Sequence, residues 1–205
     1  MLPSLMIIDD FLVDPWAARR EALGLGYDPA EQKGNFPGMN SSRSVDTAGI
    51  DASVSRQLGI KLKGAAGTDH GHCRLTSKAD KGRSGVHIDP AAYSGILFLS
   101  RPEDCSAPSA GGTDFFRHKR TGLEKVPHDP AQIAAAGYGD INALVEDVVN
   151  KDTTSSAKWE RTMRIPIRFN RLILFSPWQF HTAAPGFGKS PEDSRLVMLL
   201  FFDRA

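Results

Sequence analysis

The sequence predicts a mainly β protein with some helix (α+β), in the form of a sandwich or jelly roll decorated with helices. Short apolar runs recur through most of the chain, and clusters of turn residues separate them. Helical signals are confined to the N-terminal part and to one later interruption. A length of 205 residues suits one domain with its own core and is short for two, so we expect a single domain over residues 1–205.

The N-terminal part, about residues 1–65, is expected to support a sheet with helices. Asp14 and Pro15 supply an N-cap and a first-turn proline, and Gly24 ends the helix that they begin. The stretch that follows is rich in Gly, Pro, Asn and Ser and is therefore predicted to be a loop. The expected elements of this part are a strand at 5–8, a helix at 15–23, a loop at 27–47 and a helix at about 51–58.

The remainder, about residues 70–205, is predicted to form the β core. A segment at about 129–152 opens with an Asp-Pro cap and interrupts this core as a helical insert. A tight turn is expected near Asn170, because Asn tolerates the left-handed backbone conformation. The expected strands lie at 72–77, 85–88, 94–100, 113–117, 163–169, 171–176 and 195–203.

Charge and composition narrow the classes of function. The 25 Lys and Arg residues balance 24 Asp and Glu to a net charge of +1, and they are dispersed, which argues against nucleic acid as the main partner. No apolar stretch approaches membrane-spanning length and no signal peptide is recognised, so we expect no membrane association. Cys73 and Cys105 are too few and too far apart for a disulfide framework, which fits a reducing cytoplasm. The sequence makes no prediction of oligomeric state.

One short motif places two metal-ligand side chains together. His87 and Asp89 are two residues apart, so on an extended backbone both side chains lie on one face, within reach of one ion. The pair is a weak signal alone, but an apolar strand and a Pro-containing turn lead to a third candidate, His181. Two His and one carboxylate form a facial triad that leaves three octahedral positions open. Zinc with the same ligands would favour tetrahedral geometry and hydrolysis, so the ligands alone do not select the reaction.

Arg195 begins the final apolar strand, where a charged residue needs a partner. An arginine fork pairs bidentately with a carboxylate and stays charged at any relevant pH. A dicarboxylate such as 2-oxoglutarate is therefore the favoured partner. A structural acid, Asp193 or Asp203, is the alternative.

An ordered set of features runs through most of the chain. In chain order these are Ile-Ile-Asp-Asp-Phe-Leu near the N-terminus with its Asp-Pro helix, His87-x-Asp89, Gly111-Gly112-Thr113 opening a strand, the strand from Asn170 to Phe175, His181 and Arg195. Together they resemble the prolyl-hydroxylase-like branch of the 2-oxoglutarate/Fe(II)-dependent oxygenases.

The resemblance implies a double-stranded β-helix with His87, Asp89 and His181 as ligands of Fe(II). It implies that Arg195 binds the distal carboxylate of the cosubstrate 2-oxoglutarate. Phe98 falls roughly where relatives often have a tyrosine that hydrogen-bonds the cosubstrate. This chain departs from the family in the long spacing between Asp89 and His181, which the insert creates, and in a longer loop before Arg195.

The activity implied by the resemblance is that of a dioxygenase. Such an enzyme uses dioxygen, converts 2-oxoglutarate to succinate and CO2, and hydroxylates a C–H bond of an amino acid, a peptide or protein, or a small molecule. Two rival classes remain open. One is a non-catalytic jelly-roll module that binds a metal or small ligand, and the other is a cupin-type metal-dependent hydrolase or isomerase.

Other candidate residues have competing interpretations. The run from His70 to Cys73 superficially resembles a metal cluster, but a solvated turn leading into a strand is favoured. His118 is expected either at the substrate mouth or at a basic, solvated strand end. Trp178 and Phe180 are favoured as sheet core over a substrate platform. The insert at about 129–152 is either a lid or a packing element.

Overall fold

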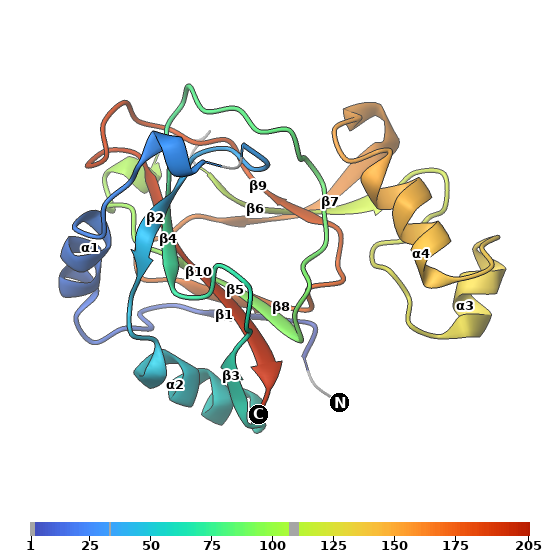
Figure 1. The fold of residues 1–205 in the computed structure, drawn as a ribbon, viewed down its shortest axis with the longest axis horizontal. Helices are drawn as coiled ribbons and strands as arrows, with labels where there is room; N and C mark the ends of the chain where they lie inside the picture. The colour runs from blue at the N-terminus through green and yellow to red at the C-terminus, as the bar shows by residue number, and fades with distance from the viewer. Residues whose placement is uncertain (1–2, 33, 107–110) are drawn as a thin grey trace.

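The computed structural model describes residues 3–32, 34–106 and 111–205, and it contains two antiparallel sheets that lie face to face (Figure 1). Within these ranges the larger sheet has seven strands and the smaller has three. The larger sheet consists of β1 (Leu5–Ile8), β2 (Met39–Ser44), β3 (Leu62–Gly64), β4 (His72–Thr76), β5 (Tyr93–Phe98), β8 (Leu172–Phe175) and β10 (Arg195–Arg204). The smaller sheet consists of β6 (Gly112–His118), β7 (Trp159–Pro166) and β9 (His181–Ala183).

Strands that are far apart in sequence are neighbours in both sheets. The larger sheet has the order β1-β8-β5-β10-β4-β2, with β3 paired to the far end of β10, and the smaller has the order β7-β6-β9. The last strand, β10, therefore lies between β5 and β4. Two antiparallel sheets wound in this way are a jelly roll, so the predicted mainly β fold is confirmed.

Strand β10 has apolar side chains on both faces of the larger sheet. Leu196, Met198 and Leu200 face one core, and the alternate residues Val197 and Leu199 face another. Because side chains alternate along a strand, a strand that is covered on both sides needs apolar residues at nearly every position. The continuous apolar run that ends the sequence is the result.

Helices α1 (Pro15–Leu23) and α2 (Ala48–Leu58) cover the outer face of the larger sheet (Figure 1). Asp14 caps α1 by accepting a hydrogen bond from the backbone N–H of Ala17 at 2.8 Å. Val54 and Leu58 of α2 are buried in the same core as the sheet. The prediction that N-terminal helices buttress the sheet is therefore correct. No helix in the described ranges is long and apolar enough to span a membrane.

A second core fills the space between the two sheets. Phe175, Val197 and Leu199 come from the larger sheet, and Phe115 and Ile165 come from the smaller. The rings of Phe115 and Phe175 meet edge to face, with centroids 5.3 Å apart. This core fills part of the interior, and the candidate site occupies the neighbouring part.

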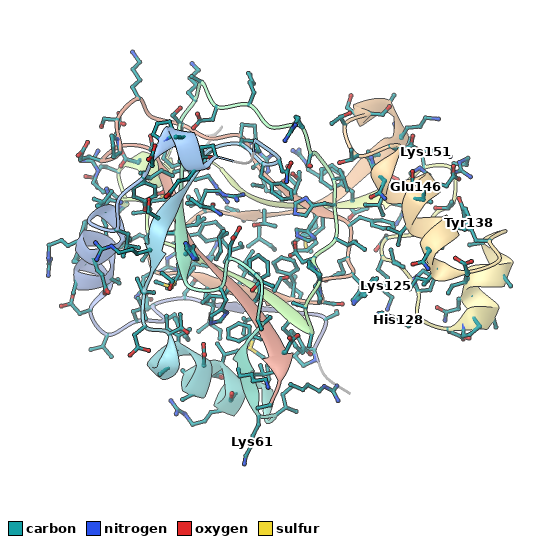
Figure 2. All side chains as sticks on the ribbon, viewed as in Figure 1. Lys61, Lys125, His128, Tyr138, Glu146 and Lys151 are labelled. Atoms are coloured by element: carbon teal, nitrogen blue, oxygen red, sulfur yellow. The ribbon has the colours of Figure 1, made fainter. Side chains whose placement is uncertain are left out.

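The helical insert carries a third core and projects beyond the end of the smaller sheet (Figure 1). Leu144 and Val148 pack there against Trp159 and Phe180. The labelled side chains of Tyr138, Glu146 and Lys151 lie on this insert, away from both sheets (Figure 2). Its helical segments are α3 (Pro130–Ala135), α4 (Ile141–Leu144) and the π-helical turn η3 (Val145–Asn150).

Several predicted boundaries were wrong. The predicted loop at 27–47 contains β2, whose polar sequence Met-Asn-Ser-Ser-Arg-Ser has no apolar alternation and pairs only with β4. The predicted strand at 163–169 is β7, displaced to Trp159–Pro166. Strands β3 and β9 are short and were not predicted. Short 3-10 turns occur at η1 (Pro29–Glu31), η2 (Asp104–Ser106) and η4 (Ser156–Lys158).

The predicted strand at 85–88 was also wrong. The backbone of this segment nevertheless pairs with His181. Only His87 makes a bridge there, to His181, and the surrounding residues are irregular. The tight turn near Asn170 is correct, because this residue has a φ of 61° in the left-handed region.

Candidate metal centre

Backbone pairing brings the three predicted metal ligands together. The N–H of His87 donates to the carbonyl of His181 at 2.9 Å, and the N–H of His181 donates to the carbonyl of His87 at 3.1 Å. The N–H of Asp89 donates to the carbonyl of Pro177 at 3.0 Å. These bonds fasten the 87–89 segment, which precedes β5, to the chain on either side of the turn that leads into β9.

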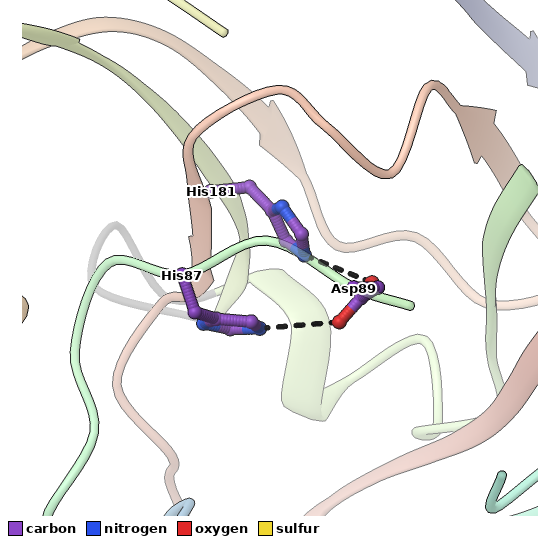
Figure 3. Close-up of side chains that lie close together, drawn as sticks. All are labelled: His87, Asp89 and His181. Carbon is purple, nitrogen blue, oxygen red and sulfur yellow. Dashed lines mark ion pairs between the residues drawn. The ribbon is translucent and has the colours of Figure 1, made fainter. Parts of the chain in front are cut away.

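The three side chains converge on a common point (Figure 3). The Nε2 atom of His87 lies 3.7 Å from Oδ1 of Asp89, and Nε2 of His181 lies 3.2 Å from Oδ2. One ligand atom from each residue lies within 4.8 Å of the other two. Among the described residues, the His, Cys, Asp or Glu side chains that form a group of three or more able to hold a metal ion are His87, Asp89 and His181.

Hydrogen bonds fix the orientation of both imidazoles. Nδ1 of His87 lies 2.9 Å from the carbonyl of Gly85, and Nδ1 of His181 lies 2.8 Å from the carbonyl of Gln179. A carbonyl oxygen only accepts, so each Nδ1 carries the proton and donates it. Each Nε2 then presents a lone pair toward the Asp89 carboxylate. A backbone carbonyl behind each histidine ligand is a common arrangement in metal sites.

Burial and the neighbouring groups set the charge of the site. Burial lowers the pKa of His87 to about 4, with a further lowering by His181, so this imidazole is neutral near pH 7. Burial alone would raise the pKa of Asp89, but the His181 and His87 rings in their protonated form, together with the Ser94 hydroxyl, lower it to about 2. Ser94 donates a hydrogen bond of 2.5 Å to Oδ2 of Asp89. A carboxylate faced by two lone pairs is an unfavourable group of acceptors that a cation would stabilise, so these residues fit a divalent metal ion.

A cavity of about 110 Å³ lies beside the three ligands. It occupies the interior between the two sheets, next to the second core. Its wall is mainly apolar, and its polar lining includes threonine hydroxyls, the Asp69 carboxylate and the guanidinium groups of Arg74 and Arg195. The lining residues nearest to this argument are Ile96, Thr113, Thr182, Arg195, Val197 and Leu199.

Arg195 is buried in this wall, and among the described residues it has no acidic partner. Its side chain is 2% exposed, and burial lowers the pKa of its guanidinium to about 10, which leaves it charged near neutral pH. Among the described residues, its one hydrogen bond runs from Nη2 to the carbonyl of Gly112 at 3.3 Å, and Nε has no partner. The alternative acid Asp193 instead accepts hydrogen bonds from the backbone of Lys189 and Ser190.

Two other features of the cavity concern Arg195. The Thr113 hydroxyl also lines the cavity, is buried and has no hydrogen-bond partner in the part of the chain that the structure describes. Gly111 lies so close that a Cβ atom there would meet Cδ of Arg195 at 2.8 Å. An oxyanion placed against Arg195 and Thr113 would satisfy both orphaned donors, so the cavity fits a carboxylate.

Phe98 lies in the core between the sheets and not in the lining of the cavity. Its side chain is fully buried, and the guanidinium carbon of Arg195 lies 5.8 Å from its ring centroid. This is the range of a cation–π contact. The structure therefore places Phe98 under Arg195, where it supports the guanidinium and has no polar group to offer a cosubstrate.

The remaining candidate residues are structural. Both expectations for His118 were wrong, because it is fully buried, with Nε2 3.0 Å from Oδ2 of Asp152 and Nδ1 3.0 Å from the Thr121 hydroxyl. This contact ties the insert to β6. Phe180 belongs to the core of the insert, and Trp178 packs against the same core. No residue of the insert at 129–152 lines either of the two spaces beside the proposed metal ligands, which favours packing over a lid.

The run from His70 to Cys73 does not form a metal cluster in the structure. His70 contacts the Thr47 hydroxyl at 2.9 Å and Asp51 at 3.2 Å, and His72 bonds the carbonyl of Ser41. Cys73 is buried in the outer core of the larger sheet. The sequence did not predict that Ser94 bonds Asp89 or that Thr113 lines the cavity. The side-chain alternation along β5 and β6 was the signal that could have indicated both.

A family model described as a family of unknown function, DUF6445, matches residues 87–202. The chain belongs to this family. The matched segment of DUF6445 begins at His87 and also contains Asp89, His181 and Arg195. Family membership assigns no activity, and no curated protein matches the sequence.

Solved structures of known enzymes share the fold of this DUF6445 protein. A prolyl-4-hydroxylase from Pseudomonas putida has a TM-score of 0.51 and 13% identity, over 98% of this chain and 93% of that one. A non-heme alpha-ketoglutarate-dependent carbocyclase, SnoK from nogalamycin biosynthesis, has a TM-score of 0.56 and 13% identity, over 98% and 80%. HygX from Streptomyces hygroscopicus, solved with nickel, 2-oxoglutarate and hygromycin B, has a TM-score of 0.51 and 11% identity, over 98% and 83%.

At these identities the likeness shows the fold. The chain has the double-stranded β-helix of the 2-oxoglutarate/Fe(II)-dependent oxygenases, as the sequence predicted. The geometry of this chain adds that its own residues fit a metal ion and a carboxylate side by side.

Proposed function

We propose that this DUF6445 protein is a dioxygenase that uses Fe(II) and 2-oxoglutarate to hydroxylate a C–H bond. The observation that carries the proposal is the buried guanidinium of Arg195, which has no acidic partner among the described residues and lies in the wall of a cavity beside three candidate metal ligands. A buried unpaired charge is costly, so its presence at this place indicates a ligand that pairs with it.

The proposed roles follow from the contacts. His87, Asp89 and His181 hold the metal ion, and Ser94 fixes the Asp89 carboxylate by its hydrogen bond. Arg195 binds the distal carboxylate of 2-oxoglutarate. When bound, Fe(II) and 2-oxoglutarate supply the oxidation of a substrate C–H bond by dioxygen, with release of succinate and CO2.

The surrounding side chains position these groups and exclude water. Thr113 donates its hydroxyl to the same carboxylate as Arg195, and Phe98 holds the guanidinium in place through its ring. Val197 and Leu199 of β10 give the cavity an apolar wall. An apolar wall strengthens the charged hydrogen bonds inside the cavity.

We also propose that residues 1–205 act as one oxygenase domain, because the helices and the insert pack on the same two sheets. Cys73 and Cys105 are free thiols, which supports the cytoplasm as the compartment. The substrate is a small molecule, an amino acid or a peptide or protein side chain.

The direct functional test is succinate formation from 2-oxoglutarate by the purified protein loaded with Fe(II) in air. We expect succinate from the wild type and none from Asp89→Ala. Metal binding without succinate, even with candidate substrates present, would favour a non-catalytic binding module. Turnover of a substrate without dioxygen and without 2-oxoglutarate would favour a cupin-type hydrolase or isomerase.

A further inference from the structure

A second arginine, Arg74, lies on the same face of the larger sheet as Arg195. Arg74 is on β4, where it is the register partner of Val197, and Arg195 is the partner of Thr76. Because side chains alternate along each strand, both arginines point into the interior between the sheets. Arg74 is among the residues that line the cavity beside the metal ligands.

Arg74 also lines a larger cleft of about 500 Å³. Asp69, Asp89 and Phe36 belong to the lining of both spaces, so the larger cleft adjoins the smaller cavity at the proposed metal ligand Asp89. We call this larger space the outer cleft.

The contacts of Arg74 leave part of its guanidinium free. Nε donates to Oδ1 of Asn40 at 2.6 Å, and within the described residues Arg74 has no ion pair within 4.0 Å. Its guanidinium carbon lies 5.4 Å from the Phe36 ring, whose centroid lies 4.4 Å from that of His87. Phe36 therefore contacts both the proposed metal ligand His87 and Arg74, so the guanidinium of Arg74 lies close to the proposed metal centre.

Among the described residues, the carboxylates that line the outer cleft are those of Glu31, Asp69 and Asp89. Glu31 and Asp69 line it, and each accepts one hydrogen bond, from Ser42 and from Asn40 respectively. A simple acid would meet Arg74 but would also face these two carboxylates. A zwitterion satisfies both signs, because its carboxylate pairs with Arg74 and its ammonium group lies toward the acids.

We propose that the substrate is a small zwitterion, a free amino acid, whose carboxylate is bound by Arg74 and whose ammonium group is bound by Asp69 and Glu31. This inference rests on the proposed oxygenase function and assigns its substrate class. The two arginines have separate roles in this proposal. Arg195 binds the cosubstrate in the cavity beside the three metal ligands, and Arg74 binds the substrate in the outer cleft.

The test measures binding and does not require turnover. Thermal unfolding of the protein is followed with each of the common L-amino acids, with and without a divalent metal ion and 2-oxoglutarate, under anaerobic conditions. We expect at least one amino acid to raise the unfolding temperature. Its amide, which lacks the carboxylate, and its N-acetyl derivative, which lacks the ammonium group, should bind at least about tenfold more weakly.

Variants separate the two arginines. Arg74→Gln should weaken binding of that amino acid at least about tenfold and leave 2-oxoglutarate affinity unchanged, while Arg195→Gln should do the reverse. Arg56→Gln, an exposed position on α2 outside both spaces, is the matched control and should change neither. The comparison of acid with amide in the wild type holds even if Arg74→Gln folds poorly.

The outcomes distinguish this inference from the proposed function. It is overturned if no amino acid stabilises the protein, if the amide binds as well as the acid, or if Arg74→Gln loses 2-oxoglutarate instead. In those cases 2-oxoglutarate binding by the wild type would still support the oxygenase. Absence of 2-oxoglutarate binding, together with an Arg74-dependent amino-acid shift, would instead overturn the oxygenase and keep the amino-acid site.

Discussion

His87 and His181 are joined by two backbone hydrogen bonds, each residue donating its N–H to the carbonyl of the other. Their imidazole centroids lie 4.4 Å apart. The two proposed metal ligands are therefore positioned by main-chain pairing before any metal binds. Such preorganisation reduces the entropy lost on binding, and it leads to the prediction that the ligands can be removed without loss of the fold.

Replacement of Asp89 tests the metal site. Asp89→Ala should reduce Fe(II) affinity by at least about 100-fold, because even residues that only support ligands contribute about 10–100-fold. Equilibrium dialysis with metal analysis measures this, and circular dichroism checks the fold. Asp147→Ala, on the surface of the insert, is the control. Equal metal affinity in Asp89→Ala and Asp147→Ala would remove Asp89 from the site.

Ser94 is predicted to act through Asp89. Ser94→Ala removes the hydroxyl that donates to the carboxylate and should lower Fe(II) affinity by about 10–100-fold. The bound stoichiometry should stay the same, because all three ligands remain. Calorimetric titration gives both quantities. An unchanged affinity would mean that the hydrogen bond does not orient the ligand.

Arg195 is predicted to destabilise the ligand-free fold and to strengthen the binding of 2-oxoglutarate. Arg195→Met keeps an unbranched apolar stem and removes a buried charge that has no acidic partner among the described residues, so the ligand-free protein should become more stable by about 1–3 kcal/mol. The same change should weaken 2-oxoglutarate binding by at least about tenfold. Urea unfolding and ligand titration provide the two measurements. Lower stability combined with unchanged 2-oxoglutarate affinity would assign Arg195 a structural role.

His118 is predicted to hold the insert and not to serve the reaction. His118→Ala removes a buried ring and leaves Asp152 without its partner, which should cost about 2–4 kcal/mol. Protease cleavage within the insert at 129–152 should increase, while Fe(II) affinity stays within about twofold of wild type. Arg120→Ala, which removes an exposed ion pair with Asp147, should cost less than about 1 kcal/mol. A large loss of metal affinity in His118→Ala would show that the insert supports the site.

The sequence allowed the long apolar strands and the capped helix to be predicted, because their signals are local. The strand β10 and the helix α1 both carry their full pattern within a few residues. Strand β9 has three residues, and β2 is polar, so their extended form depends on the partners β6 and β4. A strand stabilised by its neighbour leaves little trace in its own sequence.

The residues of the candidate site also differ in whether the sequence could predict them. His87, Asp89, His181 and Arg195 could be identified because each is a chemically distinctive residue next to an apolar run. The position of Phe98 beneath Arg195 depends on the register of β5 with β10, in which Phe98 pairs with Val197. The role of Arg74 likewise depends on β4 lying beside β10. Register between distant strands is a property of the folded sheet and could not be predicted from one sequence.

The most direct test of the central claim is an anaerobic titration of the Fe(II)-loaded protein with 2-oxoglutarate, followed by visible absorption. We predict the weak charge-transfer band of a keto acid chelated to ferrous iron, at a stoichiometry of one per chain. The band should be absent in His181→Ala, and in Arg195→Met it should require at least about ten times more 2-oxoglutarate. If the wild type binds iron and no band forms at saturating 2-oxoglutarate, the proposed function is contradicted.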